Sequence, residues 1–237
     1  MPILPFQLLR VGFRVGDRPL LDDVTLTIDA GPKTVILGPN GAGKSLLLRL
    51  CHGLIGPTAG SITWLGPEAR QARRRQAMVF QKPVMLRRSL RANVAYGLKL
   101  QGQPPEQRRR RVVEALERTG LVDRADQYAP SLSVGEQQRL ALARVWALAP
   151  EILFLDEPTA SLDPGATAAV ETIIDQIHQS GTKIVMTTHD LAQARRIADE
   201  VIFLHGGQVT ERTAAKRFFD RPTSDAGRAF LDGKLMW

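Results

Sequence analysis

A glycine-rich segment that ends in a lysine and a serine carries the clearest chemical signal in the chain. It comprises Gly38, Pro39, Asn40, Gly41, Ala42, Gly43, Lys44 and Ser45. Its glycines let successive backbone N–H groups face one anion, and a helix that follows directs its positive end to the same place. Lys44 can reach the β- and γ-phosphates of a nucleotide, and Ser45 can offer its hydroxyl to Mg²⁺. The spacing therefore predicts a phosphate-binding loop.

Two carboxylates follow a continuous apolar run further along the chain. Ile152–Leu155 reads as a buried strand, and Asp156 and Glu157 come directly after it. A strand end places such carboxylates at the edge of the sheet, near the phosphate loop if the two strands are neighbours. Asp156 is then a candidate to hold Mg²⁺ through water, and Glu157 is the candidate general base that polarises an attacking water.

A third group lies at the expected start of a helix. Ser133 and Glu136 have the spacing of a capping box, which explains these two residues but leaves Gly135 unexplained. A capped helix N-terminus with a serine hydroxyl and a bare glycine N–H can also bind a γ-phosphate. We therefore consider Ser133, Gly135 and Glu136 candidate nucleotide contacts.

The elements that must position these groups follow from hydrophobic periodicity. Apolar residues at spacing two before residue 30 predict two strands, joined by a turn at residues 16–19. A short apolar run predicts a strand at 34–37, and continuous apolar runs predict buried central strands at 152–155 and 184–186. Further strand candidates lie at 62–64 and 78–80. We expect helices at 46–54, 108–121, 136–148 and from Asp163-Pro164 to about 179, and a hairpin over 201–209.

Composition narrows the class of protein. The chain has 237 residues, a net charge of +8 and one cysteine, Cys51, which excludes a disulfide framework and favours a reducing cytoplasm. Neither a secretory signal nor an apolar stretch of membrane-spanning length is visible. Residues 70–111 hold 13 basic side chains and one acid, Glu106, whereas the rest of the chain holds 19 basic and 23 acidic residues. This basic segment suits an anionic surface, although a solvated arginine-rich helix face explains it equally well.

Together these motifs resemble those of ATP-binding cassette (ABC) ATPases, the motor subunits of transporters, over the whole length of the chain. The loop Gly38–Ser45 is similar to the Walker A motif, Ile152–Asp156 to Walker B, and Leu132–Gln137 to the signature motif. Gln81 matches the glutamine of the Q-loop, Ser161–Asp163 the D-loop, and His189 the switch histidine. Six motifs in the right order are far more specific than any one of them.

The resemblance implies an α/β fold. This is a P-loop NTPase core with a mixed, mostly parallel sheet, an N-terminal antiparallel β subdomain and an inserted helical subdomain. The chain would be one ABC ATPase domain, with its core at 1–82 and 149–237 and its helical subdomain at 83–148. It also implies ATP and Mg²⁺ as cofactors, with Lys44, Glu157 and His189 in catalysis. Ser45, Gln81 and Asp156 would hold the metal, and Asp163 would join the nucleotide contacts.

The resemblance further implies a homodimer, in which the signature of one subunit completes the nucleotide site of the other. The dimer would drive an integral membrane permease that meets the helical subdomain, with a periplasmic or lipid-anchored solute-binding protein as an indirect partner and no nucleic acid. We therefore expect a peripheral protein at the cytoplasmic face of the inner membrane, which would also account for the basic segment.

The sequence departs from the family pattern at three places. Val134 replaces the first glycine of the signature, and Leu46 follows Ser45 where a threonine is common. Val15 stands where an aromatic residue usually stacks on adenine; Phe13, two residues away, is the candidate replacement, and Arg18 is a weaker one. We include Leu46, Val15 and Phe13 among the candidate nucleotide contacts.

Three stretches are similar to the ATPases of tungstate-type oxyanion importers: residues 77–89, 183–190 and 230–237. We therefore expect uptake of a small solute, tungstate or molybdate, with phosphate and polar amino acids as open alternatives.

A soluble cassette ATPase acting on nucleic acid or ribosomes is the alternative class. However, the chain has neither a coiled-coil insertion nor a second cassette. Single-stranded nucleic acid is bound through aromatic residues among basic ones, and residues 83–111 contain only one aromatic residue, Tyr96. A small-molecule kinase would leave the signature and His189 without a role.

Overall fold

The computed structural model describes residues 2–234, and these divide into two compact units. Unit 1 comprises residues 2–78, 154–157 and 183–234, and unit 2 comprises residues 79–153 and 158–182. The last part of the C-terminal stretch noted above, residues 235–237, lies outside the described range. The strands β5 (Gln76–Val79) and β6 (Ile152–Asp156) each pass from one unit into the other.

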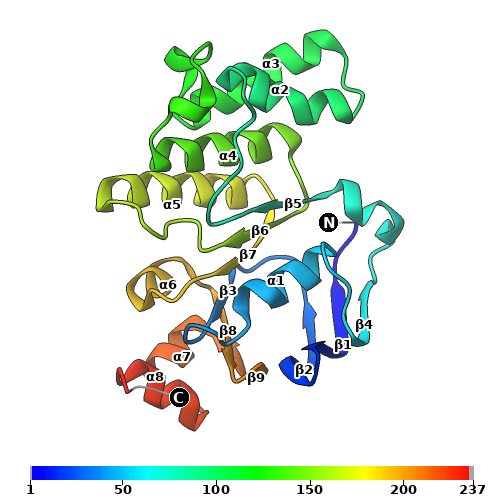
Figure 1. Ribbon diagram of the computed structural model, residues 1–237, viewed down its shortest axis with the longest axis vertical. Coiled ribbons are helices and arrows are strands. Elements are labelled where there is room, and N and C mark those ends of the chain that lie inside the picture. The colour runs from blue at the N-terminus through cyan, green and yellow to red at the C-terminus, as the bar shows by residue number, and fades with distance from the viewer. Residues whose placement is uncertain (1, 235–237) are drawn as a thin grey trace. The chain divides into compact units, whose positions relative to one another are not determined.

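Unit 1 contains an antiparallel sheet in the order β2-β1-β4 (Figure 1). Its strands are β1 (Phe6–Val15), β2 (Arg18–Ile28) and β4 (Ala59–Trp64). The alternation expected of a half-buried strand is present at Val24, Leu26 and Ile28, all of which are buried. The predicted turn is shorter than expected: Val15 pairs with Arg18, so that Gly16 and Asp17 alone form the turn and Pro19 belongs to β2.

A six-stranded sheet in the order β5-β6-β7-β3-β8-β9 forms the core of the fold. Its other strands are β3 (Thr34–Leu37), β7 (Lys183–Thr187), β8 (Glu200–His205) and β9 (Gln208–Ala214). β3 pairs in parallel with both β7 and β8, whereas β8 and β9 form the expected antiparallel hairpin. Every residue of β3, β6 and β7 is buried, which confirms the prediction that the continuous apolar runs are central strands.

Unit 1 also contains helices beside this sheet. They are α1 (Lys44–His52), α6 (Leu191–Ile197), α7 (Ala215–Asp220) and α8 (Asp225–Leu231), with a 3-10 helix at Ala69–Arg74. The helix α1 begins two residues earlier than predicted, directly on the lysine of the glycine-rich loop. It ends at His52 because Gly53 takes a left-handed conformation and its N–H bonds back to the last turn.

Unit 2 is built mainly from helices (Figure 1). They are α2 (Leu90–Leu100), α3 (Pro105–Arg118), α4 (Val134–Leu148) and α5 (Pro164–Gln179), with 3-10 turns at Val122–Arg124 and Ala129–Ser131. The helix α5 packs against α4, and α2 and α3 pack against each other and against α4. The helices α2, α3 and α4 share a core that includes Leu90, Val94, Val112, Leu116 and Leu140. The helix α3 begins three residues earlier than expected because Pro105 serves as its first residue. The helix α5 has the predicted N-cap, Asp163, which accepts a hydrogen bond from Ala166 N at 2.9 Å.

Candidate active site

The glycine-rich loop joins β3 to α1, as predicted, and its tight path requires glycine. A Cβ atom on Gly38 would lie 2.1 Å from the carbonyl oxygen of Leu204 on the neighbouring strand. At Gly43, where φ is 101°, it would lie 2.9 Å from Leu21. These two positions therefore require glycine, and they allow the tight path that brings the loop to the N–H groups at the start of α1.

The side chain of Lys44 is buried and lies back across this loop. Its Nζ donates hydrogen bonds to the carbonyl oxygens of Gly38, at 2.9 Å, and Pro39, at 3.0 Å. Burial lowers the pKa of Lys44, while the nearby carboxylates of Glu157 and Asp156 act in the opposite direction. The ammonium group is thus held beside the position where the loop would receive phosphate oxygens.

Ser45 and Asp156 form the oxygen-rich part of the site. Ser45 Oγ donates to Asp156 Oδ1 at 2.7 Å, and Thr187 Oγ1 donates to the same carboxylate oxygen at 2.9 Å. A hydroxyl and a carboxylate are hard oxygen donors of the kind that Mg²⁺ prefers, and Mg²⁺ usually takes its remaining ligands from water and substrate phosphates. Within residues 2–234, no group of three or more His, Cys, Asp or Glu side chains could hold a metal alone. The residues therefore fit Mg²⁺ that arrives with a nucleotide.

Glu157 lies at the centre of the charged groups. Its Oε1 is 4.0 Å from Lys44 Nζ, and its Oε2 is 3.1 Å from Nδ1 of His189. The backbone of Glu157 has φ 45°, a left-handed conformation that is uncommon for a residue other than glycine. This conformation is held by its N–H, which donates to Thr187 O at 3.2 Å and to Thr187 Oγ1 at 3.1 Å. Unusual backbone geometry at a charged residue in a site is typical of functional positions.

The second candidate cluster lies in unit 2 and contains the signature residues. Ser133 and Glu136 form the predicted capping box at the start of α4. The Glu136 carboxylate also pairs with Arg124, so that its two oxygens are already engaged. A cavity of about 510 Å³ is lined by this helix start and by the start of α5, including Gly135 and Asp163. A Cβ atom at Gly135 would lie 2.9 Å from that of Ala166, so that the two helices can approach only because this residue is glycine.

The remaining predicted residues are placed in three separate positions. Gln81 follows β5, is exposed and belongs to unit 2. Phe13 and Val15 lie on β1 of unit 1, where Phe13 is partly buried and Val15 is 61% exposed. Leu46 lies in the first turn of α1 and is partly buried. The structure thus brings together Lys44, Ser45, Asp156, Glu157 and His189 within unit 1.

Two side chains that contact the candidate site residues were absent from the prediction. Thr187 is the last residue of β7 and contacts the carboxylate of Asp156 and the backbone N–H of Glu157, and Arg124 pairs with Glu136. A hydroxyl at the end of the otherwise apolar run 184–187 was an available signal for the first. The sequence carries no comparable signal for Arg124, one of many arginines, because its contact depends on the path of the 3-10 turn that contains it.

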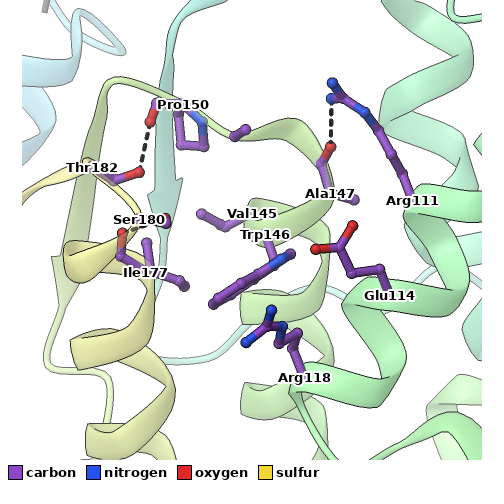
Figure 2. A pocket seen from close by; sticks show the side chains of 11 residues that line it. Arg111, Glu114, Arg118, Val145, Trp146, Ala147, Pro150, Ile177, Ser180 and Thr182 are labelled. Carbon is purple, nitrogen blue, oxygen red and sulfur yellow. Dashed lines mark hydrogen bonds between the residues drawn. The ribbon is translucent and has the colours of Figure 1, made fainter. Parts of the chain in front are cut away.

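A further cavity of about 340 Å³ lies in unit 2, away from these motifs (Figure 2). The side chain of Arg118 lies over the ring of Trp146, with 5.2 Å from its Cζ atom to the ring centroid. Arg111 Nη1 donates to the carbonyl oxygen of Ala147 at 3.2 Å, and Thr182 Oγ1 donates to the carbonyl oxygen of Pro150 at 2.8 Å (Figure 2). Arg111, Arg118 and Thr182 therefore already have partners within the chain.

No helix within residues 2–234 is long and apolar enough to cross a membrane.

Comparison with known proteins places these observations in a family. The family model described as "ABC transporter" matches residues 21–160. A phosphate import ATP-binding protein of Natronomonas pharaonis is 41% identical over 235 residues, covering 92% of this chain and 83% of the relative. A tungstate uptake system ATP-binding protein of Peptoclostridium acidaminophilum is 41% identical over 197 residues, covering 83% of this chain and 92% of the relative. A methionine import ATP-binding protein of Nocardia farcinica is 39% identical, covering 99% of this chain and 74% of the relative.

A solved structure supports the same conclusion. It is the dimer of an ATP-binding cassette in a post-hydrolysis state bound to ADP and Pi, and it is 28% identical with a TM-score of 0.78, covering 89% of this chain and 98% of that one. The order of the motifs, the P-loop fold and these similarities agree with one another. The chain belongs to the ABC transporter family, as an ATPase subunit of the importer type.

Proposed function

We propose that this ATPase powers the uptake of a small oxyanion, tungstate or molybdate, and that Glu157 is its general base. The observation that carries the catalytic part is the position of the Glu157 carboxylate, which lies between Lys44 Nζ at 4.0 Å and His189 Nδ1 at 3.1 Å. A carboxylate in this position can take a proton from water beside the transferred phosphoryl group.

In this proposal, the loop Gly38–Ser45 binds the phosphates of ATP through backbone N–H groups, and Lys44 leaves the loop carbonyls to reach the β- and γ-phosphates. Ser45 and Asp156 would hold Mg²⁺, which would neutralise charge on the phosphates when bound. Water oxygen forms a bond to the γ-phosphorus while the bond to the bridging oxygen of ADP breaks. Glu157 accepts the proton that the water loses, and His189 donates a hydrogen bond to the γ-phosphate.

We further propose that the active form is a homodimer. The capped start of α4, with Ser133 and Gly135, would contact the γ-phosphate held by the other subunit, and Asp163 would lie at the same interface. This is supported by the cavity that these residues line and by the dimeric solved structure bound to ADP and Pi. The N-terminus of α4, where Val134 is exposed, can offer backbone N–H groups to an anion that another surface holds.

The permease contact is assigned to the helical subdomain, which we delimit at 83–148. Its basic residues suit the cytoplasmic face of the inner membrane, where anionic lipids give a negative surface potential. The protein would lie there peripherally, bound to an integral permease, and a periplasmic or lipid-anchored solute-binding protein would deliver the cargo. Nucleic acid has no role in this proposal.

The choice of cargo rests on similarity, because the ATPase does not touch the solute. The 41% identity to a tungstate uptake protein supports tungstate, together with the three stretches noted in the sequence. Phosphate is the alternative, since a phosphate import protein is equally similar over a longer alignment. Both are tetrahedral oxyanions.

Uptake in cells tests this proposal. The gene would be deleted, tungstate and molybdate supplied at scarce levels, and cellular tungsten, molybdenum and radiolabelled phosphate uptake measured. Complementation would use the wild type, Glu157→Gln and, as a matched control, Asp220→Asn, which changes an exposed carboxylate in α7. We expect tungsten or molybdenum uptake to fall and to return with the wild type and the control only. If only phosphate uptake falls, the cargo is phosphate and not tungstate or molybdate. If Glu157→Gln restores uptake, Glu157 is not the general base.

A further inference from the structure

The hydroxyl of Thr187 connects the carboxylate of Asp156 with the backbone of Glu157 in the candidate active site. Thr187 is completely buried at the end of β7, directly beside the end of β6 in the sheet. Its Oγ1 donates to Asp156 Oδ1 at 2.9 Å and accepts from the backbone N–H of Glu157 at 3.1 Å. One side chain therefore contacts the candidate metal ligand and the backbone of the candidate base.

These bonds continue to the glycine-rich loop. Ser45 Oγ donates to the same oxygen of Asp156 at 2.7 Å, so that Oδ1 accepts two hydroxyl protons. Hydrogen bonds to a charged acceptor are about twice as strong as those between neutral groups, and here they fix the rotation of the carboxylate. Asp156 Oδ2 remains on the other side, 4.0 Å from Arg49 Nη2.

The same hydroxyl also supports the unusual backbone of Glu157. A left-handed residue other than glycine costs of order 1–3 kcal/mol and persists only where its surroundings hold it. At Glu157 the holding contacts are the two hydrogen bonds from its N–H to Thr187, one to the backbone oxygen and one to the hydroxyl. Removing the hydroxyl leaves only the longer bond, at 3.2 Å.

We propose that Thr187 is a positioning residue, which holds the carboxylate of Asp156 and the backbone of Glu157 in the orientation that ATP hydrolysis needs. It touches neither ATP nor water in this role; it acts through the carboxylate of Asp156 and the backbone of Glu157. The inference rests on the proposed roles of Asp156 and Glu157. A valine would have nearly the same shape and would fill the buried position equally well, so that the hydroxyl is what the proposal requires.

The test compares purified Thr187→Val and Thr187→Ser with the wild type. We expect Thr187→Val to lower kcat by about 10- to 100-fold, the range that a hydrogen bond to a charged group represents, with KM for ATP changed much less. Thr187→Ser keeps the hydroxyl and should retain most of kcat. In thermal melting with ADP, the additional stabilisation by Mg²⁺ should shrink in the valine variant and persist in the serine variant.

Two controls make the outcome decisive. Thr182 lies just before the start of β7, and its buried hydroxyl donates to the carbonyl oxygen of Pro150. Thr182→Val removes this hydroxyl and should leave kcat unchanged. If Thr187→Val does not fold, Thr187→Ser and Thr187→Ala form a second pair that differs only in the hydroxyl. Wild-type kcat and an unchanged Mg²⁺ effect in the valine or alanine variant would overturn the proposal.

Glu157→Gln is measured in parallel to separate this inference from the proposed function. If Glu157→Gln is inactive while Thr187→Val is not impaired, the role of Thr187 is wrong and the base assignment stands. If Glu157→Gln retains wild-type turnover, the base assignment itself falls, whatever Thr187→Val does.

Discussion

His189 Nδ1 lies 3.1 Å from Oε2 of Glu157, while Lys44 Nζ approaches the other oxygen of the same carboxylate at 4.0 Å. Each oxygen of Glu157 thus has its own partner, on β3–α1 for the lysine and after β7 for the histidine. The carboxylate is held between a buried cation and a half-exposed imidazole. Such an arrangement fixes its orientation before a nucleotide arrives, and the first two predictions follow from it.

Glu157→Gln should bind ATP but hydrolyse it slowly. The amide keeps the shape of the side chain but cannot accept a proton, and loss of a general base lowers the rate by about 10²- to 10⁴-fold. Phosphate release and size-exclusion chromatography with ATP and Mg²⁺ would show a stalled enzyme that accumulates as a dimer. Asp220→Asn should behave as the wild type. Turnover at the wild-type rate in Glu157→Gln would contradict the assignment.

His189→Ala should lower kcat in a manner that is not additive with Glu157→Gln. Since the two side chains contact each other, each single variant removes the same paired unit, and groups that act as a unit are strongly non-additive. A double-mutant cycle on kcat measures this coupling. Independent, multiplying effects would show that the contact has no part in the reaction.

Phe13→Ala should weaken ATP binding if Phe13 takes the place of the aromatic residue that Val15 does not supply. Loss of an aromatic stacking contact costs about 1–3 kcal/mol, which corresponds to a rise in Kd of several-fold to about 100-fold. The matched control is Leu9→Ala, which truncates an exposed apolar side chain elsewhere on β1, and both variants are measured by fluorescence titration. Equal affinities for the wild type and Phe13→Ala would leave adenine without this contact.

The thiol of Cys51 should be inert in the folded protein. It is 4% exposed within α1, and burial raises the pKa of the thiol to about 12, so that little reactive thiolate forms at mildly alkaline pH. A thiol reagent should label the protein only after denaturation. Rapid labelling of the native chain would show that α1 opens readily next to the glycine-rich loop.

Lys183 should make stability depend on pH. Burial lowers the pKa of its ammonium group from 10.5 to about 8, although Nζ donates to Thr34 Oγ1 at 2.8 Å. Between these two values the unfolded chain binds more protons than the folded one, so that the free energy of unfolding rises with pH in that window. Urea denaturation should be measured for the wild type and for Lys183→Met at several pH values below 8 and between 8 and 10.5. As the pH rises from 8 towards 10.5, the free energy of unfolding of the wild type should increase relative to that of Lys183→Met. A constant difference between the two proteins would contradict the shift.

Much of this fold is predictable because its strongest signals are local. The buried strands β3, β6 and β7 are continuous apolar runs, and α5 begins at Asp163-Pro164 as its sequence indicates. Boundaries that depend on pairing are less accessible: Pro19 belongs to β2 only because Val15 pairs with Arg18. The contacts of Thr187 and Arg124 were missed for the same reason: the hydroxyl at the end of the run 184–187 marks Thr187 as a polar position but does not identify its partners. Such contacts depend on which residues face one another across a sheet or a turn, and no local pattern encodes this.

The position of β3 between β7 and β8 has a consequence for how the protein is made. On a ribosome, Thr34–Leu37 is complete long before either neighbouring strand exists, because these neighbours lie at 183–187 and 200–205. At 5–20 residues per second, translation leaves this apolar strand without its partners for about 10–30 s. The strand next to the glycine-rich loop therefore gains its two neighbours only after β7 and β8 have been made, and the catalytic centre cannot assemble before then.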